Sequence, residues 1–262
     1  LNVNVGQHNF DELRFEYYRD RDVSLEAFKA DDYDFRIENS AKRWATGYDF
    51  PAVEAGDVVL ETFETRQAEP MQGYVFNLRR EKFQDPRVRR AFNLAFDFEW
   101  LNENIFYGQY ERTDSYFQNT ELAAEGLPEG RERAILEEVR DQVPPEVFTE
   151  EYENPTAGSP RALRENLREA ARLFREAGWR VEDGVLTHRE TGETMTVEFL
   201  INSPATERVL SPYVEQLRRL GVDPSIRLVD VTQYQRRLDT FDFDIVTGVF
   251  QQSLSPGNEQ RD

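Results

Sequence analysis

The side chains that most often perform chemistry in proteins are scarce in this sequence. Its 262 residues include no cysteine and only two histidines, His8 and His188. The lack of cysteine excludes disulfides, thiolate zinc sites and a cysteine nucleophile. Two histidines are too few for most histidine-based metal or acid–base sites, and none of the motifs GxSxG, HExxH, GxxxxGK[ST] or GxGxxG occurs. We therefore expect no catalytic residue, no metal site and no cofactor.

Carboxylates are the remaining candidates for catalysis, and their spacing does not favour it. Adjacent acidic pairs such as Asp31-Asp32 and Glu137-Glu138 indicate solvated surface, because carboxylate catalysis needs two groups on facing walls several ångströms apart. A carboxylate-dependent hydrolase stays open as an alternative. It would require two carboxylates in a shared pocket, one of them with a raised pKa.

Composition indicates a folded, strongly acidic protein. Hydrophobic residues make up 39% and aromatic residues 13%, which is enough for a sizeable core. The sequence contains 51 Asp and Glu but only 32 Lys and Arg, which gives a formal charge of −19. Such a chain repels nucleic-acid phosphates and anionic membrane surfaces, so we expect no nucleic-acid partner. The sequence has no apolar run of 18 residues and therefore predicts no transmembrane helix.

The C-terminal part shows the element order that could position a binding site. Strands are predicted at residues 195–201, 226–231 and 243–250, with helices at 205–220 and 232–238 between them. This β-α-β-α-β order is typical of a parallel sheet with right-handed crossovers. Ligands of such sheets bind beyond the carboxyl ends of the strands.

Aromatic and amide side chains occur near those ends, without the pairing of a nucleophile with a base that catalysis requires. This combination favours a receptor over an enzyme. An earlier strand, predicted at 72–78, adds an aromatic and an amide. The predicted ligand-binding residues are Tyr74, Asn77, Asn202, Asp230, Phe250, Gln251, Gln252 and Ser253.

The remaining pattern predicts one mixed α/β lobe without an internal repeat and without a domain linker in residues 107–160. Aspartate-proline and serine-proline pairs open helices at 85–96 and 159–178. Shorter helices are predicted at 23–30, 40–44, 99–105 and 132–143, the last within an irregular stretch at 107–160. Strand composition also occurs at 13–18, 34–37 and 58–65.

Several stretches resemble the extracellular solute-binding proteins of peptide and nickel ABC importers. GYVFNLRREKFQDPRVRRAFNLAFDFEW at 73–100 is similar to that family's F-x-D-x-RVR-x-A-x-x-x-A-x-D stretch. AARLFREAGW at 170–179 resembles its A-x-x-L-L-x-x-A-G-W helix end, and YVEQLRRLG at 213–221 resembles its L-x-x-x-G-I unit. The opening, residues 6–53, looks like the subgroup related to the Yej-type receptor.

The resemblance implies a fold and a function. The fold would be a periplasmic-binding-protein type II lobe, a mixed β-sheet with flanking helices, and residues 1–262 would form the second of two lobes, the first being absent from this chain. The protein would be a periplasmic, monomeric receptor that closes two lobes on an oligopeptide or modified peptide. It would then deliver this cargo to an ABC permease in the inner membrane. A ligand-sensing domain on the same receptor fold stays open as an alternative.

One binding motif of the family is changed here. In peptide receptors the last strand leads into W-x-x-D, whose aspartate pairs with the amino group of the peptide. Phe250 stands at the tryptophan position and Ser253 at the aspartate position. A neutral hydroxyl cannot form the charge-assisted bond to an ammonium group. The resemblance therefore implies that Asp230 or another carboxylate substitutes, or that the ligand is a modified peptide or one whose amine is recognised differently.

Overall fold

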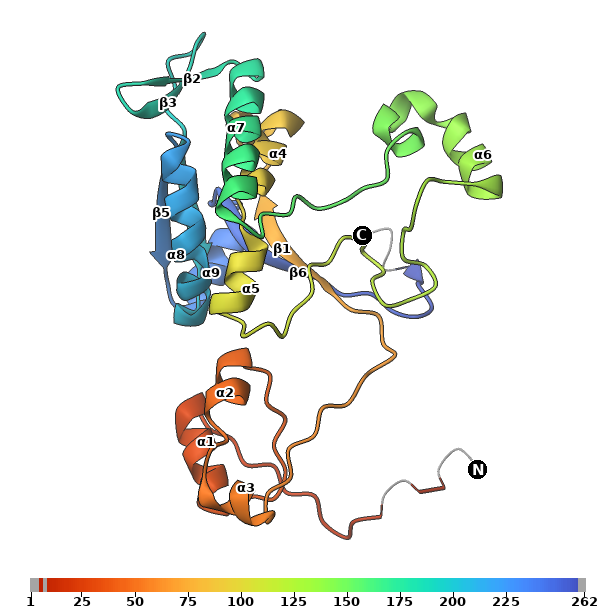
Figure 1. Cartoon of the computed structure of the whole chain (residues 1–262), viewed down its shortest axis with the longest axis vertical. Coiled ribbons are helices and arrows are strands. Elements are labelled where there is room, and N and C mark those ends of the chain that lie inside the picture. Colours follow the sequence, from red (N-terminus) through yellow and green to blue (C-terminus); the bar gives the residue numbers. More distant parts are fainter. Residues whose placement is uncertain (1–4, 7–8, 259–262) are drawn as a thin grey trace. The chain divides into compact units, whose positions relative to one another are not determined.

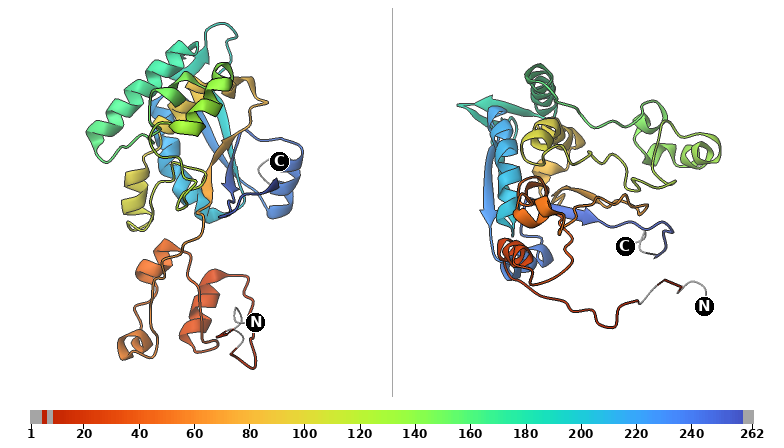
Figure 2. Two further views of the ribbon diagram at one scale, coloured as in Figure 1. Left: turned by 90° about the vertical axis from the view of Figure 1, so that its right-hand side faces the viewer. Right: turned by 60° about the horizontal axis from the view of Figure 1, so that its bottom comes forward.

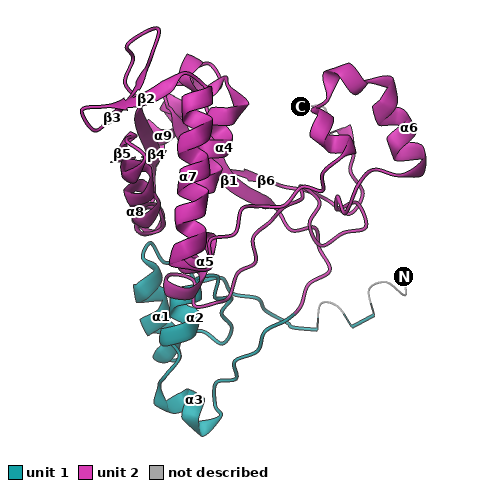
Figure 3. Cartoon of the chain, turned by 45° about the horizontal axis from the view of Figure 1, so that its top comes forward, with its two compact units in different colours: residues 1–63 teal, residues 64–262 magenta. Residues whose placement is uncertain are grey.

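The computed structural model describes residues 5–6 and 9–258. The chain divides into two compact units, Leu1–Phe63 and Glu64–Asp262 (Figure 3). No helix within the described ranges is both long and apolar enough to cross a membrane.

In the described part of the first unit, three short helices are joined by extended segments. The helices are α1 (Arg21–Lys29), α2 (Ala41–Thr46) and α3 (Pro51–Ala55). Asp20 caps α1 by accepting the N–H groups of Asp22 and Val23, and Ser40 caps α2. The small core of this unit contains Leu25, Ala27, Ala41 and Tyr48.

The strands predicted in this unit are wrong for the described residues. Residues 13–18, 34–37 and 58–63 belong to no strand, and α3 was not predicted. A strand exists only with a hydrogen-bonded neighbour, and these extended segments have none among the described residues.

The second unit is built on a four-stranded mixed sheet (Figure 1). Its order is β1 (Met71–Phe76), β6 (Ile245–Phe250), β4 (Thr196–Ile201) and β5 (Asp223–Leu228). Strands β4, β5 and β6 are parallel, and β1 is antiparallel to β6. The predicted parallel β-α-β-α-β end is confirmed, although β5 begins three residues earlier than predicted. Pro224 is compatible with this strand because β5 lies at the edge of the sheet.

Both faces of the sheet are covered. Helices α4 (Pro86–Leu94), α7 (Pro160–Glu176) and α8 (Pro204–Arg219) supply most of the larger core, which also contains side chains of β4 and β6. Figure 2 shows α4 and α7 side by side, as their packing contacts require. A smaller cluster on the other face joins Leu200 and Val246 to side chains of α9 (Val231–Asp239).

The second unit also contains helices α5 and α6, short 3₁₀ turns and a hairpin, which lie between the elements of the core along the chain. Helix α5 (Phe98–Asn104) follows α4, and α6 (Gly130–Glu138) interrupts a long irregular stretch that also holds three-residue and four-residue 3₁₀ turns. Strands β2 (Trp179–Glu182) and β3 (Val185–His188) form a separate hairpin. The capping predictions at the starts of α4 and α7 are confirmed, since Asp85 accepts the N–H of Arg87 and Ser159 that of Ala162.

Candidate functional site

The three parallel strands run towards the same side of the sheet. Ile201 of β4 pairs with Leu228 of β5, so these two strands end level with each other. Strand β6 begins opposite Phe199 of β4, at Ile245, and continues past the end of β4 to Phe250, which pairs with Met71 of β1. The predicted residues Asn202 and Asp230 therefore follow β4 and β5, whereas Phe250, Gln251, Gln252 and Ser253 lie farther along, at the extended end of β6. Both parts together are called the sheet edge below.

The polar residues of this edge combine local structural roles with exposed groups. The side chain of Asp230 accepts the N–H of Gln233 at 2.9 Å and so caps α9, which fixes a carboxylate beside the end of β5. Asp230 and Asn202 are exposed, as are Gln251 and Ser253, whereas Gln252 is half-buried. An exposed carboxylate and several amide and hydroxyl groups are suitable for binding the backbone and amino group of a peptide.

An aromatic pair lies at the end of β6. The rings of Phe250 and Tyr116 are 5.7 Å apart in an edge-to-face arrangement. Both side chains remain partly exposed, Phe250 at 41% and Tyr116 at 51%. Sequence reasoning did not select Tyr116, because it lies in an irregular stretch whose course carries no periodic signal.

Asn77 does not join this edge, which corrects the sequence-based assignment. Since β1 is antiparallel to β6, the residue after Phe76 lies at the amino end of β6. The Asn77 side chain is buried there, and its Nδ2 donates to the carbonyls of Phe241 and Phe243 at 2.9 and 2.8 Å. Asn77 therefore holds β1 to the segment that precedes β6.

Tyr74 is likewise placed in the core and not at the edge. Its ring stacks on Tyr213 of α8 with centroids 5.7 Å apart, and it contacts Phe96 and Phe199. Burial raises the pKa of Tyr74 above its ordinary value. The residue opposite Tyr74 on β6 is Thr247, whose hydroxyl is buried without a hydrogen-bond partner among the described residues.

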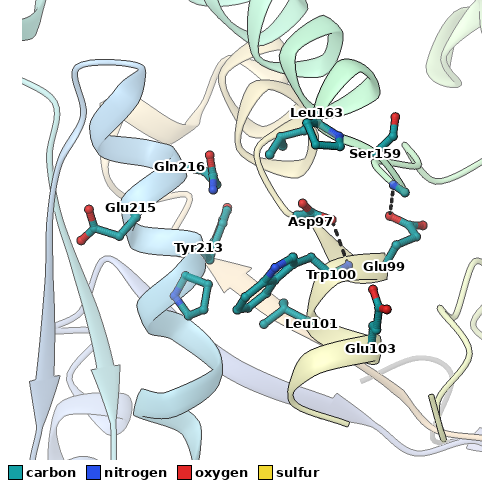
Figure 4. Close-up of a pocket in the computed structure, with 13 residues that line it drawn as sticks. Asp97, Glu99, Trp100, Leu101, Glu103, Ser159, Leu163, Tyr213, Glu215 and Gln216 are labelled. Atoms are coloured by element: carbon teal, nitrogen blue, oxygen red, sulfur yellow. Dashed lines mark hydrogen bonds between the residues drawn. The ribbon is translucent and has the colours of Figure 1, made fainter. Parts of the chain in front are cut away.

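A separate pocket of about 420 Å³ opens between α5, α7 and α8 (Figure 4). Its walls include Trp100 and Leu163, and none of the eight predicted residues lines it. Four carboxylates contribute to it, from Asp97, Glu99, Glu103 and Glu215.

The carboxylates of this pocket do not form a free catalytic pair. Burial raises the pKa of Asp97, but its carboxylate accepts the N–H of Trp100 at 3.1 Å and caps α5. Glu99 accepts the N–H of Ala157 at 2.7 Å, and Glu215 pairs with Arg218. Within the described part of the chain no group of three or more His, Cys, Asp or Glu side chains could hold a metal ion. The geometry thus gives Asp97 a capping role and Glu99 the role of fixing the loop that precedes α7.

Comparison with known proteins agrees with this receptor-like geometry. The family model for "Bacterial extracellular solute-binding proteins, family 5 Middle" matches residues 3–261. The "Probable peptide-binding protein YejA" of Agrobacterium fabrum is 49% identical over 264 residues, covering 100% of this chain and 43% of the relative. The "Peptidoglycan-binding protein YepA" of the same organism is 38% identical over 264 residues, covering 98% and 43%.

Solved structures share the fold. The oligopeptide-binding protein AppA from Bacillus subtilis, solved in complex with a nonapeptide, matches with a TM-score of 0.61 at 18% identity. The match covers 90% of this chain and 40% of AppA. The chain thus spans about two fifths of the length of these proteins. The predicted mixed sheet with flanking helices and the resemblance to Yej-type receptors are both confirmed.

Proposed function

Because the chain belongs to the bacterial extracellular solute-binding proteins of family 5, we propose that its protein is the substrate-binding component of an ABC importer and takes up oligopeptides or modified peptides. The observation that carries this proposal is the side of the sheet towards which β4, β5 and β6 run. Exposed groups of Asn202 and Asp230 follow β4 and β5, while Gln251, Ser253 and the partly exposed Phe250 ring lie at the extended end of β6. The names of relatives, one peptide-binding and one peptidoglycan-binding, support a ligand with peptide character.

The edge provides the two kinds of contact that peptide capture requires. Amide and hydroxyl groups can hydrogen-bond the backbone of an extended ligand, while Phe250 and Tyr116 supply apolar surface for its side chains. Asp230 is the carboxylate that could pair with an amino terminus, since the neutral Ser253 cannot. Its position as the cap of α9 holds it in place before the ligand arrives.

The mechanism we propose is closure of two lobes. The lobe that contains the four-stranded sheet would supply one binding wall and a second lobe of the protein the other, so that the ligand stabilises the closed state by its greater affinity for it. The closed, loaded receptor would act as a monomer in the periplasm and deliver its cargo to an inner-membrane permease. No bond of the ligand would be broken, because the protein would be a receptor and not an enzyme.

The test uses the full-length protein purified from its host. Native mass spectrometry is expected to detect a co-purified peptide or modified peptide of unchanged mass, which would then be titrated calorimetrically. Phe250→Ala should weaken binding by about tenfold or more. Burying an aromatic side chain contributes about 1.5 kcal/mol or more, which corresponds to that factor in the dissociation constant. The matched control is Phe241→Ala, since Phe241 is 45% exposed but lies at the amino end of β6.

Specific results would overturn the proposal. A protein that retains no peptide-like cargo and binds none from a peptide library would exclude the transport role. Cleavage of the cargo would indicate a hydrolase instead. Equal losses of affinity in Phe250→Ala and Phe241→Ala would show that the sheet edge does not form part of the binding site.

A further inference from the structure

Tyr116, which contacts Phe250 at the proposed binding edge, lies in a part of the chain without regular structure. No residue between α5 and α6, at 105–129, belongs to a helix or a strand. Segments of this kind are usually mobile, and mobility would leave the Tyr116 ring without a fixed position. Two polar side chains close to it in the sequence, Ser115 and Asn119, hold the segment by hydrogen bonds.

Ser115 closes the segment into a loop. This residue is only 6% exposed, and its Oγ accepts the N–H of Phe117 at 3.3 Å and that of Ala124 at 3.0 Å. The second of these bonds joins the two ends of residues 115–124, which therefore form a closed loop. The buried hydroxyl thus fixes the backbone on both sides of Tyr116.

Asn119 fastens the same loop to the segment that leads into β1. Its Nδ2 donates to the carbonyl oxygens of Thr65 and Gln67 at 3.3 and 2.8 Å. The backbone adds a further bond, from the N–H of Glu69 to the carbonyl of Gln118 at 3.0 Å. The backbone of Asn119 is in the left-handed region, with a φ of 65°, which asparagine adopts more readily than most residues.

These attachments connect Tyr116 and Phe250 to the same piece of backbone. Strand β1 begins at Met71, which pairs with Phe250 of β6. The segment that Asn119 holds comes just before Met71 in the chain. The loop and the end of β6 are therefore both tied to the start of β1, and the edge-to-face contact of the Tyr116 and Phe250 rings at 5.7 Å is formed without a ligand.

Closing this loop contributes little to the apolar core. Ser115 alone among residues 115–124 is buried, while Tyr116 and Leu122 are 51% and 46% exposed. The hydrogen bonds therefore fix an exposed aromatic side chain and not an apolar cluster. A side chain that is ordered before binding loses less conformational freedom when a ligand arrives, so the affinity is higher.

We infer that Ser115 and Asn119 are positioning residues of the proposed binding site, which hold Tyr116 beside Phe250 for contact with the peptide. They act through the Tyr116 ring and need no contact with the ligand. The inference rests on the proposed peptide-binding function and assigns two residues that prepare its aromatic wall.

The test measures the peptide affinity of full-length variants. The probe is a library of synthetic nonapeptides with free and with acetylated amino termini, and the member that the unmodified protein binds most tightly is titrated calorimetrically. Ser115→Ala and Asn119→Gly should each weaken binding about fivefold to tenfold, as expected for the loss of hydrogen bonds that order the site. Glycine is chosen for Asn119 because it adopts the left-handed backbone without strain.

A second background separates positioning from general stabilisation. In the variant Tyr116→Ala, adding Ser115→Ala or Asn119→Gly should change the affinity less than about twofold, because the ring through which both residues act is gone. The matched control is Asn102→Ala. Asn102 makes two hydrogen bonds to the backbone of Tyr110, at 2.7 and 3.1 Å, and neither bond involves residues 115–124, so its replacement should leave the affinity unchanged.

Hydrogen exchange of the same proteins without peptide examines the loop directly. Amides of residues 115–124 should exchange about tenfold faster in Ser115→Ala than in the unmodified protein, since the N–H of Ala124 loses its acceptor. In Asn119→Gly the same increase is expected for the amide of Glu69, because the loop is no longer fastened to the segment before β1. Amides of α7 should exchange at unchanged rates in both variants.

Three results would overturn the inference while leaving the proposed function intact. These are an unchanged affinity in both single variants, equal losses of affinity with and without the Tyr116 ring, and unchanged exchange of the loop. A different result would overturn the proposed function, and with it the role of these residues in binding. In that case the unmodified protein would bind no library peptide and carry no co-purified one.

Discussion

Replacing Asn77 tests whether this residue is structural, as its contacts indicate, or ligand-binding, as the sequence suggested. Its side chain is 4% exposed and donates two hydrogen bonds, to Phe241 and Phe243, while it accepts the N–H of Arg79 at 3.1 Å. Each such bond contributes about 1 kcal/mol net, and a buried group left without its partner costs about 1–3 kcal/mol. We therefore expect Asn77→Ala to lower the free energy of unfolding by about 2–4 kcal/mol.

The assay is urea denaturation at pH 7, followed by tryptophan fluorescence. Asn77→Asp should be more destabilising than Asn77→Ala, because a carboxylate oxygen would face two carbonyl oxygens in place of a donor. The control is Asn202→Ala, exposed at the opposite edge of the sheet, which should change stability by less than about 0.5 kcal/mol. A change for Asn77→Ala as small as that of the control would refute the reasoning.

Two capping carboxylates give pH-dependent predictions of opposite sign, each measured by urea denaturation at pH 7 and near pH 3. The hydrogen bond from Arg87 lowers the pKa of Asp85, so its stabilisation is complete above about pH 4, the ordinary Asp value, and is lost as the pH falls through the lowered pKa. Asp85→Ala should lower the free energy of unfolding by about 1 kcal/mol at pH 7 and by less near pH 3. An equal decrease at both pH values would contradict this. Burial raises the pKa of Asp97, so its ionisation opposes folding above that pKa and has no effect below about pH 4. Asp97→Asn keeps a capping side chain, and it should raise the free energy of unfolding by no more than about 0.5 kcal/mol at pH 7 and leave it unchanged near pH 3. A decrease at pH 7 would show that the carboxylate is needed for more than the cap.

Local signals in the sequence were sufficient to predict where the main helices of the second unit lie. The Asp85-Pro86 and Ser159-Pro160 pairs locate the starts of α4 and α7, because an N-cap acceptor and a proline in the first turn act within a few residues. The parallel order of β4, β5 and β6 was also predictable, since it follows from alternating strand and helix patterns.

The candidate site was predictable only where it follows from that order. Asn202, Asp230 and Phe250 lie towards one side of the sheet because β4, β5 and β6 are parallel, although β6 extends beyond the other two strands. The positions of Tyr74 and Asn77 depend on the antiparallel register of β1 against β6, which pairs residues about 170 positions apart and leaves no local signal. The sequence shows that these residues are aromatic and amide, but not which end or face of the sheet they occupy.

The failed strand predictions in the first unit have a different cause from the misplaced site residues. In β1 the sequence pattern and the structure agree, since Val75 and its neighbours contact apolar clusters on both faces of the sheet. In residues 13–18 and 34–37 the same kind of pattern occurs, but no neighbouring strand is present among the described residues. The preference of a residue for strands reflects mainly how its side chain packs against neighbours on adjacent strands. The strand-like pattern of residues 13–18 and 34–37 is therefore not sufficient to form a strand without a paired neighbour among the described residues, whereas the sheet that carries the proposed binding edge contains its own partners.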